Sequence, residues 1–227
     1  MKIPISPRLL TCAGFVHPGD RVADIGCDHG YLGIYLLQEG IARSIIAADI
    51  NEGPLQAAFQ NAHKYGVADK MSFFLSNGVR NVPQDFDTLV CAGMGAETMI
   101  SILDAAPWLQ NAHYRLILQC QTKTYLLRRY LSEHGWYITQ EAVLRDGKFL
   151  YTQMDVCWQP GDRLSPGQCY LSPAMLENLT AEVIEHSRWV YRELTKIVNS
   201  RGEAADPWMK QAAQELSTYD FLKEEVK

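Results

Sequence analysis

The sequence predicts an α/β fold: a doubly wound, mostly parallel sheet that ends in an antiparallel hairpin and is followed by a C-terminal α-helical hairpin. Three observations support this prediction. Short apolar, β-rich runs alternate with amphipathic stretches through most of the chain, which is typical of βαβ units. An Asp-Gly pair then separates two further β-rich runs. The last segment carries apolar residues at three- and four-residue steps, which is typical of helices.

The parallel strands are expected at residues 21–25, 44–50, 71–75, 87–92 and 114–119, and the helices between them at 31–39, 53–65, 97–104 and 124–134. Pro54 stands in the first turn of its helix, where a missing N–H costs nothing. Gly135 follows the last of these helices, as expected of a helix end. The order of elements therefore predicts helices on both faces of the sheet.

The antiparallel hairpin is expected to pair residues 136–144 with 149–158, around the Asp146-Gly147 turn. Residues 159–173 hold three prolines and two glycines, so we expect a linker there. Asp206 and Pro207 predict the start of a final helix, as its N-cap and first residue. The apolar stripe of the last segment comprises Leu176, Leu179, Val183, Val190, Ile197, Trp208, Ala212, Leu216, Tyr219, Leu222 and Val226. We expect two domains, residues 1–160 and residues 161–227.

The composition is ordinary for a globular protein, with 47% hydrophobic and 21% charged residues among 227. No apolar run approaches the ~18 residues of a membrane span, and the first seven residues are too short and too polar for a signal peptide. We therefore expect a cytoplasmic protein without membrane contact or an evident obligate protein partner. The net charge of −5 does not favour nucleic-acid binding, although a local basic patch can outweigh it.

The six cysteines are widely scattered and include no C-x-x-C pair. The sequence therefore predicts neither a zinc ribbon nor a thioredoxin-like site, and no metal. Several of these cysteines stand inside apolar strands, where Cys behaves as a small hydrophobe. We expect all six to be buried and reduced.

The end of the first strand is the strongest candidate for a ligand site. Gly26 and Gly30 allow a tight turn and a close ligand approach, and junctions of this kind bind ligands in open α/β sheets. The spacing is not that of a dinucleotide fingerprint, and no Walker A lysine follows. Asp28 would repel a pyrophosphate but suits a cationic amino group. These residues predict a site for a nucleoside with an ammonium-bearing tail.

Three further strand ends belong to the same edge of the sheet. Asp49 stands 23 residues beyond Gly26, where a carboxylate accepts hydrogen bonds from ribose hydroxyls. Asn77 either hydrogen-bonds an adenine edge or, with Gly78, forms a plain turn. The glycines of residues 92–96 either open room for a reacting group or form a tight turn into the next helix. Together, four such strand ends favour a functional site.

The residues 24–30 resemble the first motif of the class I S-adenosylmethionine-dependent methyltransferases, with Asp28 in place of the commoner middle glycine. That resemblance implies a Rossmann-like methyltransferase fold. A narrower resemblance is to the bacterial tRNA (adenine-22, N1)-methyltransferase family. It is carried over nearly the whole chain by Ser6-x-Arg8-Leu9 and by residues 24–32, 51–55, 92–95 and 116–119, followed by the helical hairpin.

The resemblance implies S-adenosyl-L-methionine as cofactor and N1 of an adenine in tRNA as methyl acceptor. The cofactor-binding residues that we infer with it are Arg8, Asp24, Gly26, Asp28, His29, Gly30, Asp49, Ile50, Asn77, Gly78, Ala92 and Gly93. The expected substrate-binding residues are Tyr31, Met94, Gly95, Gln119, Lys123, Arg128 and Arg129. Adenine N1 carries a free lone pair and no proton, so its methylation needs no general base, and no catalytic side chain is assigned.

Basic residues that would contact RNA, or simply remain solvated, also include Lys2, Arg145, Lys148, Arg188, Arg192 and Lys196. Glu182, Glu185 and Glu193 lie among the last three and weaken that case. The sequence departs from the family pattern at Gly33, Ala96 and Cys120-Gln121. The last departure concerns the target base, so two alternatives stay open. One is a methyltransferase acting on another RNA or a small molecule, and the other is a catalytically silent cofactor- or RNA-binding protein.

Overall fold

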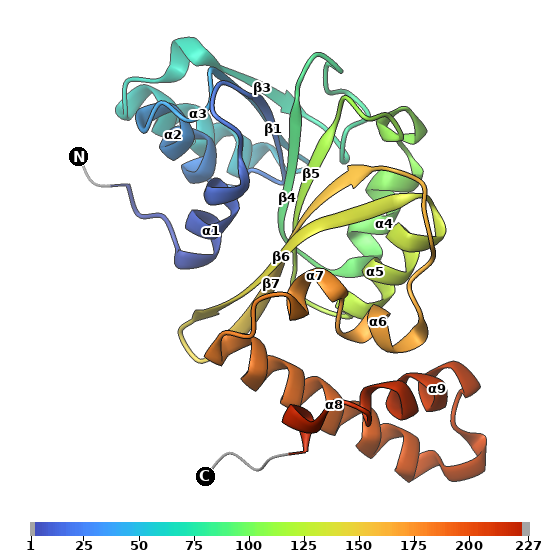
Figure 1. Ribbon diagram of the computed structural model, residues 1–227. Coiled ribbons are helices and arrows are strands. Elements are labelled where there is room, and N and C mark those ends of the chain that lie inside the picture. The colour runs from blue at the N-terminus through green and yellow to red at the C-terminus, as the bar shows by residue number, and fades with distance from the viewer. Residues whose placement is uncertain (1–2, 224–227) are drawn as a thin grey trace.

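The central feature of the fold is a mixed sheet, seen in a computed structural model that describes residues 3–223 (Figure 1). The strand order over this part of the chain is β3-β2-β1-β4-β5-β7-β6. The strands are β1 (Arg21–Ile25), β2 (Ser44–Asp49), β3 (Met71–Leu75), β4 (Thr88–Met94), β5 (Arg115–Cys120), β6 (Trp136–Asp146) and β7 (Phe149–Trp158). The first five run parallel, and β7 is antiparallel to both β5 and β6. The predicted fold class is confirmed.

Helices cover both faces of the sheet. On one face lie α1 (Pro7–Phe15), α2 (Tyr31–Gln38) and α3 (Glu52–Lys64), and on the other lie α4 (Ala96–Asp104) and α5 (Thr124–Glu133). Successive side chains along each strand point to opposite faces of the sheet, so each face has its own hydrophobic core. Val22 packs toward α1 and α2, whereas its neighbour Ala23 packs toward α4 and α5. Helix α1 was not predicted, although residues 7–15 are amphipathic and Ser6-Pro7, an N-cap followed by proline, was an available signal.

The segment predicted as a linker is instead folded onto the sheet, which corrects that prediction. It contains α6 (Pro166–Tyr170), and α7 (Pro173–Leu176) begins at its last residue. Ser165 and Gln168 form a capping box at the start of α6. Tyr170 and Leu171 are buried in a third core cluster together with the C-terminal helices. Two prolines of this segment begin short helices and do not indicate a flexible linker.

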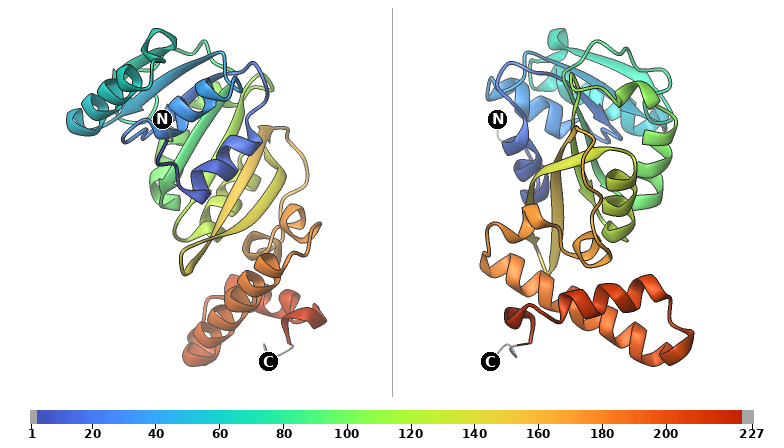
Figure 2. Two further views of the ribbon diagram at one scale, coloured as in Figure 1. Left: turned by 90° about the vertical axis from the view of Figure 1, so that its left-hand side faces the viewer. Right: turned by 45° about the vertical axis from the view of Figure 1, so that its right-hand side comes forward.

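The C-terminal helical hairpin is formed by α8 (Ala181–Arg201) and α9 (Pro207–Leu216), which lie together beyond the carboxyl ends of the parallel strands (Figures 1 and 2). Asp206 caps α9 by accepting the Trp208 N–H at 2.8 Å, as predicted. The predicted stripe is less continuous than expected: Leu176 belongs to α7, Leu179 precedes α8, and Leu222 lies in a 3₁₀ turn, Asp220–Leu222. Val226 and Lys2 lie outside the described residues. The other 3₁₀ turns are Ala68–Lys70, Pro107–Leu109 and Gly202–Ala204.

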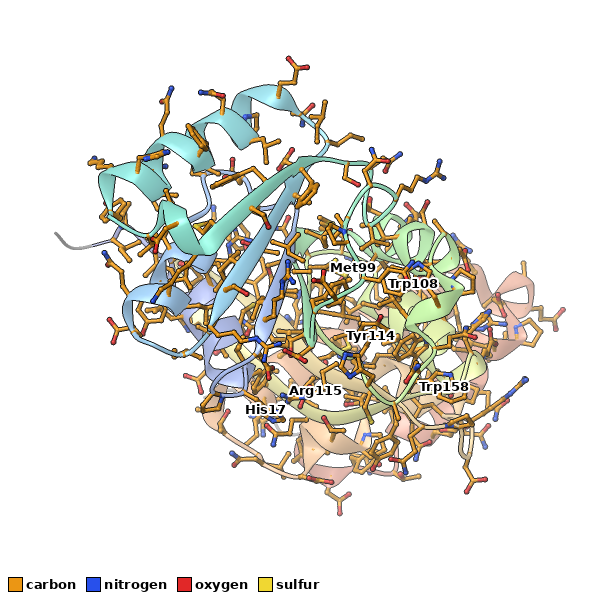
Figure 3. The ribbon with its side chains drawn as sticks, turned by 90° about the horizontal axis from the view of Figure 1, so that it is seen from above. His17, Met99, Trp108, Tyr114, Arg115 and Trp158 are labelled. Carbon is orange, nitrogen blue, oxygen red and sulfur yellow. The ribbon has the colours of Figure 1, made fainter. Side chains whose placement is uncertain are left out.

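The opposite edge of the sheet, at the amino ends of the strands, is closed by aromatic packing. Trp108 and Tyr114 lie side by side there (Figure 3) and meet edge to face, with ring centroids 5.3 Å apart. Phe86 contacts both rings. All six cysteines are unpaired, and five are buried, so the predicted reduced state holds while Cys157 is only half-buried. Within residues 3–223, no helix is long and apolar enough to cross a membrane, and no cluster of metal-ligating side chains occurs.

Candidate active site at the carboxyl edge of the sheet

The loop between β1 and α2 forms the floor of the candidate site. Gly26 and Gly30 have φ angles of 74° and 73°, and Asp28 between them has a φ of 50°. Asp is among the few residues that adopt this left-handed conformation readily. The N–H groups of Gly26 and Cys27 both donate to the Ala48 carbonyl on β2, at 2.8 and 3.0 Å. The loop is therefore fixed to the neighbouring strand, as the predicted strand–turn–helix junction requires.

Asp49, at the end of β2, fixes the same loop from the other side. Its carboxylate accepts the N–H of Asp28 at 3.2 Å and the N–H of Asn51 at 2.9 Å. A carboxylate has about four acceptor positions, so Asp49 can accept further hydrogen bonds from a ligand. Ile50 and Asn77 are exposed on the next strand ends, and Gly78 lies beside Asn77. The structure thus places a free acceptor beside an open edge of the sheet.

Asp24 lies behind the loop with only 4% of its surface exposed. Burial, together with the nearby charges of Asp49 and Asp28, raises the pKa of its carboxyl to about 7. Burial also raises the pKa of the Cys27 thiol beside it. A ligand with a positive charge at this position would be stabilised by the ionised Asp24. The chemistry of the site therefore matches the ammonium-bearing tail that the sequence predicts.

The enclosed part of the site is small, about 60 Å³. It is lined by side chains and backbone of Arg8, Leu9, Asp24, Gly26, Cys27, Asp28, His29, Tyr31, Leu32 and Ala92. Ligand pockets usually measure about 300–1,000 Å³, so the enclosed volume suits the tail of a nucleoside derivative rather than the whole molecule. The nucleoside would lie on the open edge next to Asp49 and Ile50. With the tail in the cavity and the nucleoside on the open edge, the residues present fit a nucleoside with a cationic tail.

Gln119 connects three elements around this cavity. Its side-chain carbonyl accepts the N–H of Gly93 at 2.9 Å and the Arg8 guanidinium at 3.1 Å. Gln153 on β7 donates to the Arg8 carbonyl at 2.7 Å. Gly93 has a φ of 82°, and a Cβ there would come within 2.8 Å of the Arg8 guanidinium. The end of β4 is therefore shaped around Arg8, which explains why residue 93 is glycine.

The structure gives Gln119 a positioning role, because the side chain is fully buried rather than open to a substrate. Gln153 was missed by the sequence analysis, although an amide inside an apolar strand was the available signal. Met94 and Gly95 do lie at the strand end, and Gly95 precedes α4, as predicted. Tyr31 and His29 lie close to each other above the loop, with ring centroids 5.9 Å apart. These residues are brought together as expected, while their contacts with a substrate remain a prediction.

The predicted RNA contact by Arg128 is corrected by the structure. Its side chain is 1% exposed and forms a bidentate ion pair with Glu141, with its shortest contact at 2.7 Å. The same guanidinium donates to the carbonyls of Cys169 and Tyr170. Arg129 lies apart from the site, paired with Glu133 and placed over the Trp208 ring. Lys123 is exposed and pairs with Glu97 at 2.6 Å.

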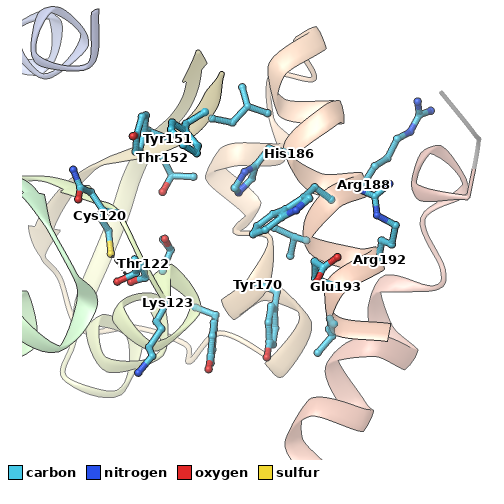
Figure 4. Close-up of a pocket in the computed structure, with 18 of the residues that line it drawn as sticks. Cys120, Thr122, Lys123, Tyr151, Thr152, Tyr170, His186, Arg188, Arg192 and Glu193 are labelled. Carbon is cyan, nitrogen blue, oxygen red and sulfur yellow. Dashed lines mark hydrogen bonds between the residues drawn. The ribbon is translucent and has the colours of Figure 1, made fainter. Parts of the chain in front are cut away.

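A second and much larger cavity, about 890 Å³, was not predicted. It lies between the β5–α5 connection, the start of β7 and helix α8, as Figure 4 shows. Tyr151 and Thr152 line one wall and His186 lines the facing wall. Burial lowers the pKa of His186 to about 4, and the positive charge of Arg128 contributes in the same direction. His186 is therefore neutral near pH 7.

Comparison with known proteins gives one family and several similar chains. Residues 5–154 match the methyltransferase domain family. The tRNA (adenine(22)-N(1))-methyltransferase of Bacillus subtilis is 31% identical over 149 residues, which cover 65% of this chain and 63% of that protein. The chain thus spans less than two thirds of the length of this curated relative.

Two solved structures are similar over almost the full chain. The B. subtilis M1A22 tRNA methyltransferase TrmK has a TM-score of 0.81 at 25% identity and is matched over 98% of both chains. TrmK of M. capricolum, in complex with S-adenosyl-homocysteine, has the same TM-score and identity, covering 96% of this chain and 99% of that one. The similarity therefore extends over the sheet, its flanking helices and the C-terminal hairpin.

Proposed function

This chain belongs to the methyltransferase domain family, and from that premise we propose that it transfers a methyl group from S-adenosyl-L-methionine to N1 of an adenine in tRNA. The single observation that carries the proposal is the carboxyl edge of the sheet. There the glycine loop and the buried Asp24 line one small cavity, and the strand-end Asp49 accepts a hydrogen bond from that loop. We propose that this edge holds a cationic tail and a ribose. Position 22 of the tRNA is proposed from the name of the B. subtilis relative.

The residues of the site have separate tasks in this proposal. Asp24 and Asp28 would face the ammonium group of the cofactor, and Asp49 would accept hydrogen bonds from its ribose. Ile50 and Asn77 would border its adenine. Arg8 and Gln119 would hold the end of β4 in place through their shared hydrogen bonds. The protein then mainly aligns donor and acceptor and excludes water, which is the principal demand of an in-line displacement.

The cofactor supplies an electrophilic methyl carbon on a sulfonium, whose bonding electron pair stays on sulfur when the carbon moves to N1. The adenine N1 lone pair forms the new bond, and the adenine leaves as a cation. No proton has to be removed before attack, so the reaction needs no general base at the site. Residues at the ends of β4 and β5, among them Met94 and Gly95, would border the acceptor base. We further propose residues 1–160 as the catalytic domain, residues 161–227 as the helical domain, and the cytoplasm as the place of action.

Methyl transfer from labelled S-adenosyl-L-methionine to bulk bacterial tRNA, followed by nucleoside analysis, tests the proposal. We expect label in 1-methyladenosine. Cofactor binding without label in any tRNA nucleoside would overturn the proposed substrate. A small-molecule acceptor, or a cofactor-binding protein without activity, would then explain the site.

The substitution Asp49→Asn tests the cofactor part of the proposal. It removes the negative charge, and because Asp28 and Asn51 donate to different oxygens of the carboxylate, it also replaces one of these two acceptors by an NH2 group. Hydrogen bonds to charged groups contribute about 1.5–3 kcal/mol, so we expect cofactor affinity to fall about tenfold or more in isothermal titration. The matched control is Asp69→Asn, an exposed aspartate away from the site. Equal affinities for the two variants would contradict the assigned role of Asp49.

A further inference from the structure

The large cavity between β7 and α8 adjoins the proposed methyl-transfer site. The Gln121 N–H donates to the Met94 carbonyl at 2.8 Å, and the Thr122 carbonyl accepts the Ala96 N–H at 3.1 Å. Gln121 and Thr122 also line the cavity. One wall of the cavity is therefore bonded directly to the strand end beside the proposed acceptor. One RNA molecule could therefore occupy the cavity and also place its acceptor base at that strand end.

Two buried hydroxyl groups in the cavity wall have no hydrogen-bond partner among the described residues. They are the side-chain oxygens of Thr152, which is 2% exposed, and Tyr170, which is 6% exposed. Figure 4 shows Thr152 and Tyr170 at different sides of the same space. Buried polar groups are nearly always paired in folded proteins. Both oxygens have almost no accessible surface, so they lie behind the cavity wall and do not face a ligand in this conformation.

Aromatic side chains line the cavity from opposite sides. Phe149 and Tyr151 come from the start of β7, and Trp189 comes from α8. Trp189 is 52% exposed and Phe149 is likewise exposed. Exposed rings next to a cavity offer flat surfaces on which bases stack, and this stacking tolerates any base because each has a π-face. The walls therefore fit a planar heterocycle better than a flexible chain.

The charge of the cavity is opposite to that of the whole chain. Five cationic side chains and two carboxylates line it, whereas the chain has a formal net charge of −5. Of the two carboxylates, Glu185 is already paired with Arg145. Of the five cations, Arg128 is paired with Glu141 and Lys123 with Glu97. Lys148 and Arg192 are exposed at its rim. A phosphate backbone is the partner that this balance favours.

We infer that the cavity between β7 and α8 binds an unpaired nucleotide of the RNA substrate, with its base between Trp189 and the start of β7. This inference rests on the proposed function. The base stacks against the exposed rings of Trp189 and Phe149, and its phosphates lie near Lys148 and Arg192. The C-terminal hairpin thereby forms one wall of the substrate site. The RNA must expose a nucleotide to enter, at a cost of a few kcal/mol that stacking offsets.

The substitution Trp189→Ala tests the stacking surface. We expect KM for bulk tRNA to rise about tenfold, from the usual strength of base–aromatic stacking, while kcat changes less and cofactor affinity is unchanged. Trp189→Phe should restore most of the loss because it keeps a ring. Tyr137→Ala is the matched control, since Tyr137 is equally exposed but lies on β6 outside the cavity. An unchanged melting temperature would confirm that the variants are folded.

A second pair of variants tests the phosphate contact. Arg192→Ala should lower the slope of log affinity against log salt by about one unit. Lys196→Ala, on the same helix but outside the cavity lining, should leave the slope unchanged. Equal salt slopes for Arg192→Ala and Lys196→Ala would overturn the proposed contact between Arg192 and a phosphate.

The outcomes separate the inference from the proposed function. If the wild-type chain methylates tRNA and Trp189→Ala behaves like Tyr137→Ala, the cavity inference is overturned while the proposed function stands. If the wild-type chain methylates no RNA, both are overturned. If the cavity variants affect only a small-molecule acceptor or a peptide, the occupant is not RNA and the inference fails.

Discussion

Three carboxylates, Asp24, Asp28 and Asp49, meet at the carboxyl edge of the sheet, and the fold buries Asp24 and Asp49 while Asp28 stays exposed. Burial and its two acidic neighbours raise the pKa of Asp24 to about 7. The sequence could identify the strand-end acid, but not its burial. Arg8 and Leu9 of α1 line the same small cavity as Asp24, and α1 was not predicted from the sequence. The position of Asp24 could therefore be predicted from the sequence, but its protonation state could not.

The substitution Asp24→Asn should stabilise the cofactor-free protein at high pH. The folded state keeps a proton that the unfolded state releases above about pH 4, so wild-type stability falls between pH 4 and pH 7. The slope is at most about 1.4 kcal/mol per pH unit. The variant cannot release that proton, so its advantage in urea unfolding should be absent at pH 4 and largest at pH 8.

The lowered pKa of His186 acts in the opposite direction, because the folded state resists its protonation and stability rises from pH 4 to pH 6.5. That contribution is the same in wild type and variant, so it cancels in the difference. A difference between Asp24→Asn and wild type that stays constant from pH 4 to pH 8 would contradict the assignment.

Among the elements, α5 joins the sheet to the C-terminal part, and its buried Arg128 contacts both. Arg128 pairs with Glu141 on β6 and donates to two carbonyls of α6, while Ser172 at the start of α7 donates to the same Glu141. In the sequence, Arg128 and Arg129 are indistinguishable adjacent cations. Only the rotation of the helix against β6 determines which one is buried.

Arg128→Met should destabilise the protein by about 3–5 kcal/mol, because it leaves the Glu141 carboxylate buried and unpaired. Arg129→Ala is the matched control and should cost less than about 1 kcal/mol, since its pair with Glu133 is exposed. Urea unfolding at pH 7 measures both. Similar losses for the two variants would mean that the buried ion pair does not stabilise the packing of α5 against β6.

Element boundaries show where sequence reasoning succeeds. The predicted bounds of β1 and β3 agree with the structure, because each strand is a short apolar run with clear flanks. The segment at residues 159–173 was misread, although the capping box of Ser165 and Gln168 was present in it. Proline and glycine indicate where an element ends, and they do not exclude a short helix between them.

At the scale of the whole molecule, the large cavity could not be predicted because its walls come from segments far apart in the chain. Cys120 to Tyr125, Lys148 to Thr152 and Glu185 to Ile197 meet only in the folded structure. The carboxyl-edge site was predictable, since parallel strands bring their ends to one edge whatever the rest of the chain does. The sequence therefore predicts which strand ends lie together, because the sheet topology determines this. It does not predict which distant segments pack around a cavity.

The two proposed domains also depend on each other. Deleting residues 161–227 removes the carbonyl partners of Arg128 and uncovers Tyr125 and Val143. We expect residues 1–160 alone to lose at least as much stability as Arg128→Met loses, seen as a lower melting temperature. A truncated chain that melts with the full-length protein would show instead that residues 1–160 are independent. The point variants in the cavity are therefore the sharper test of RNA binding.

The contact between Gln153 and Arg8 has a consequence for how the protein is made. These residues are 145 positions apart in the chain, and ribosomes add about 5–20 residues per second. Arg8 thus leaves the ribosome on the order of ten seconds before its β7 partner exists. During that interval α1 has no finished surface on which to settle, although β1 and β2 can already pair. The wall that Arg8 provides to the cofactor site is therefore completed late in synthesis, after the glycine loop that it covers.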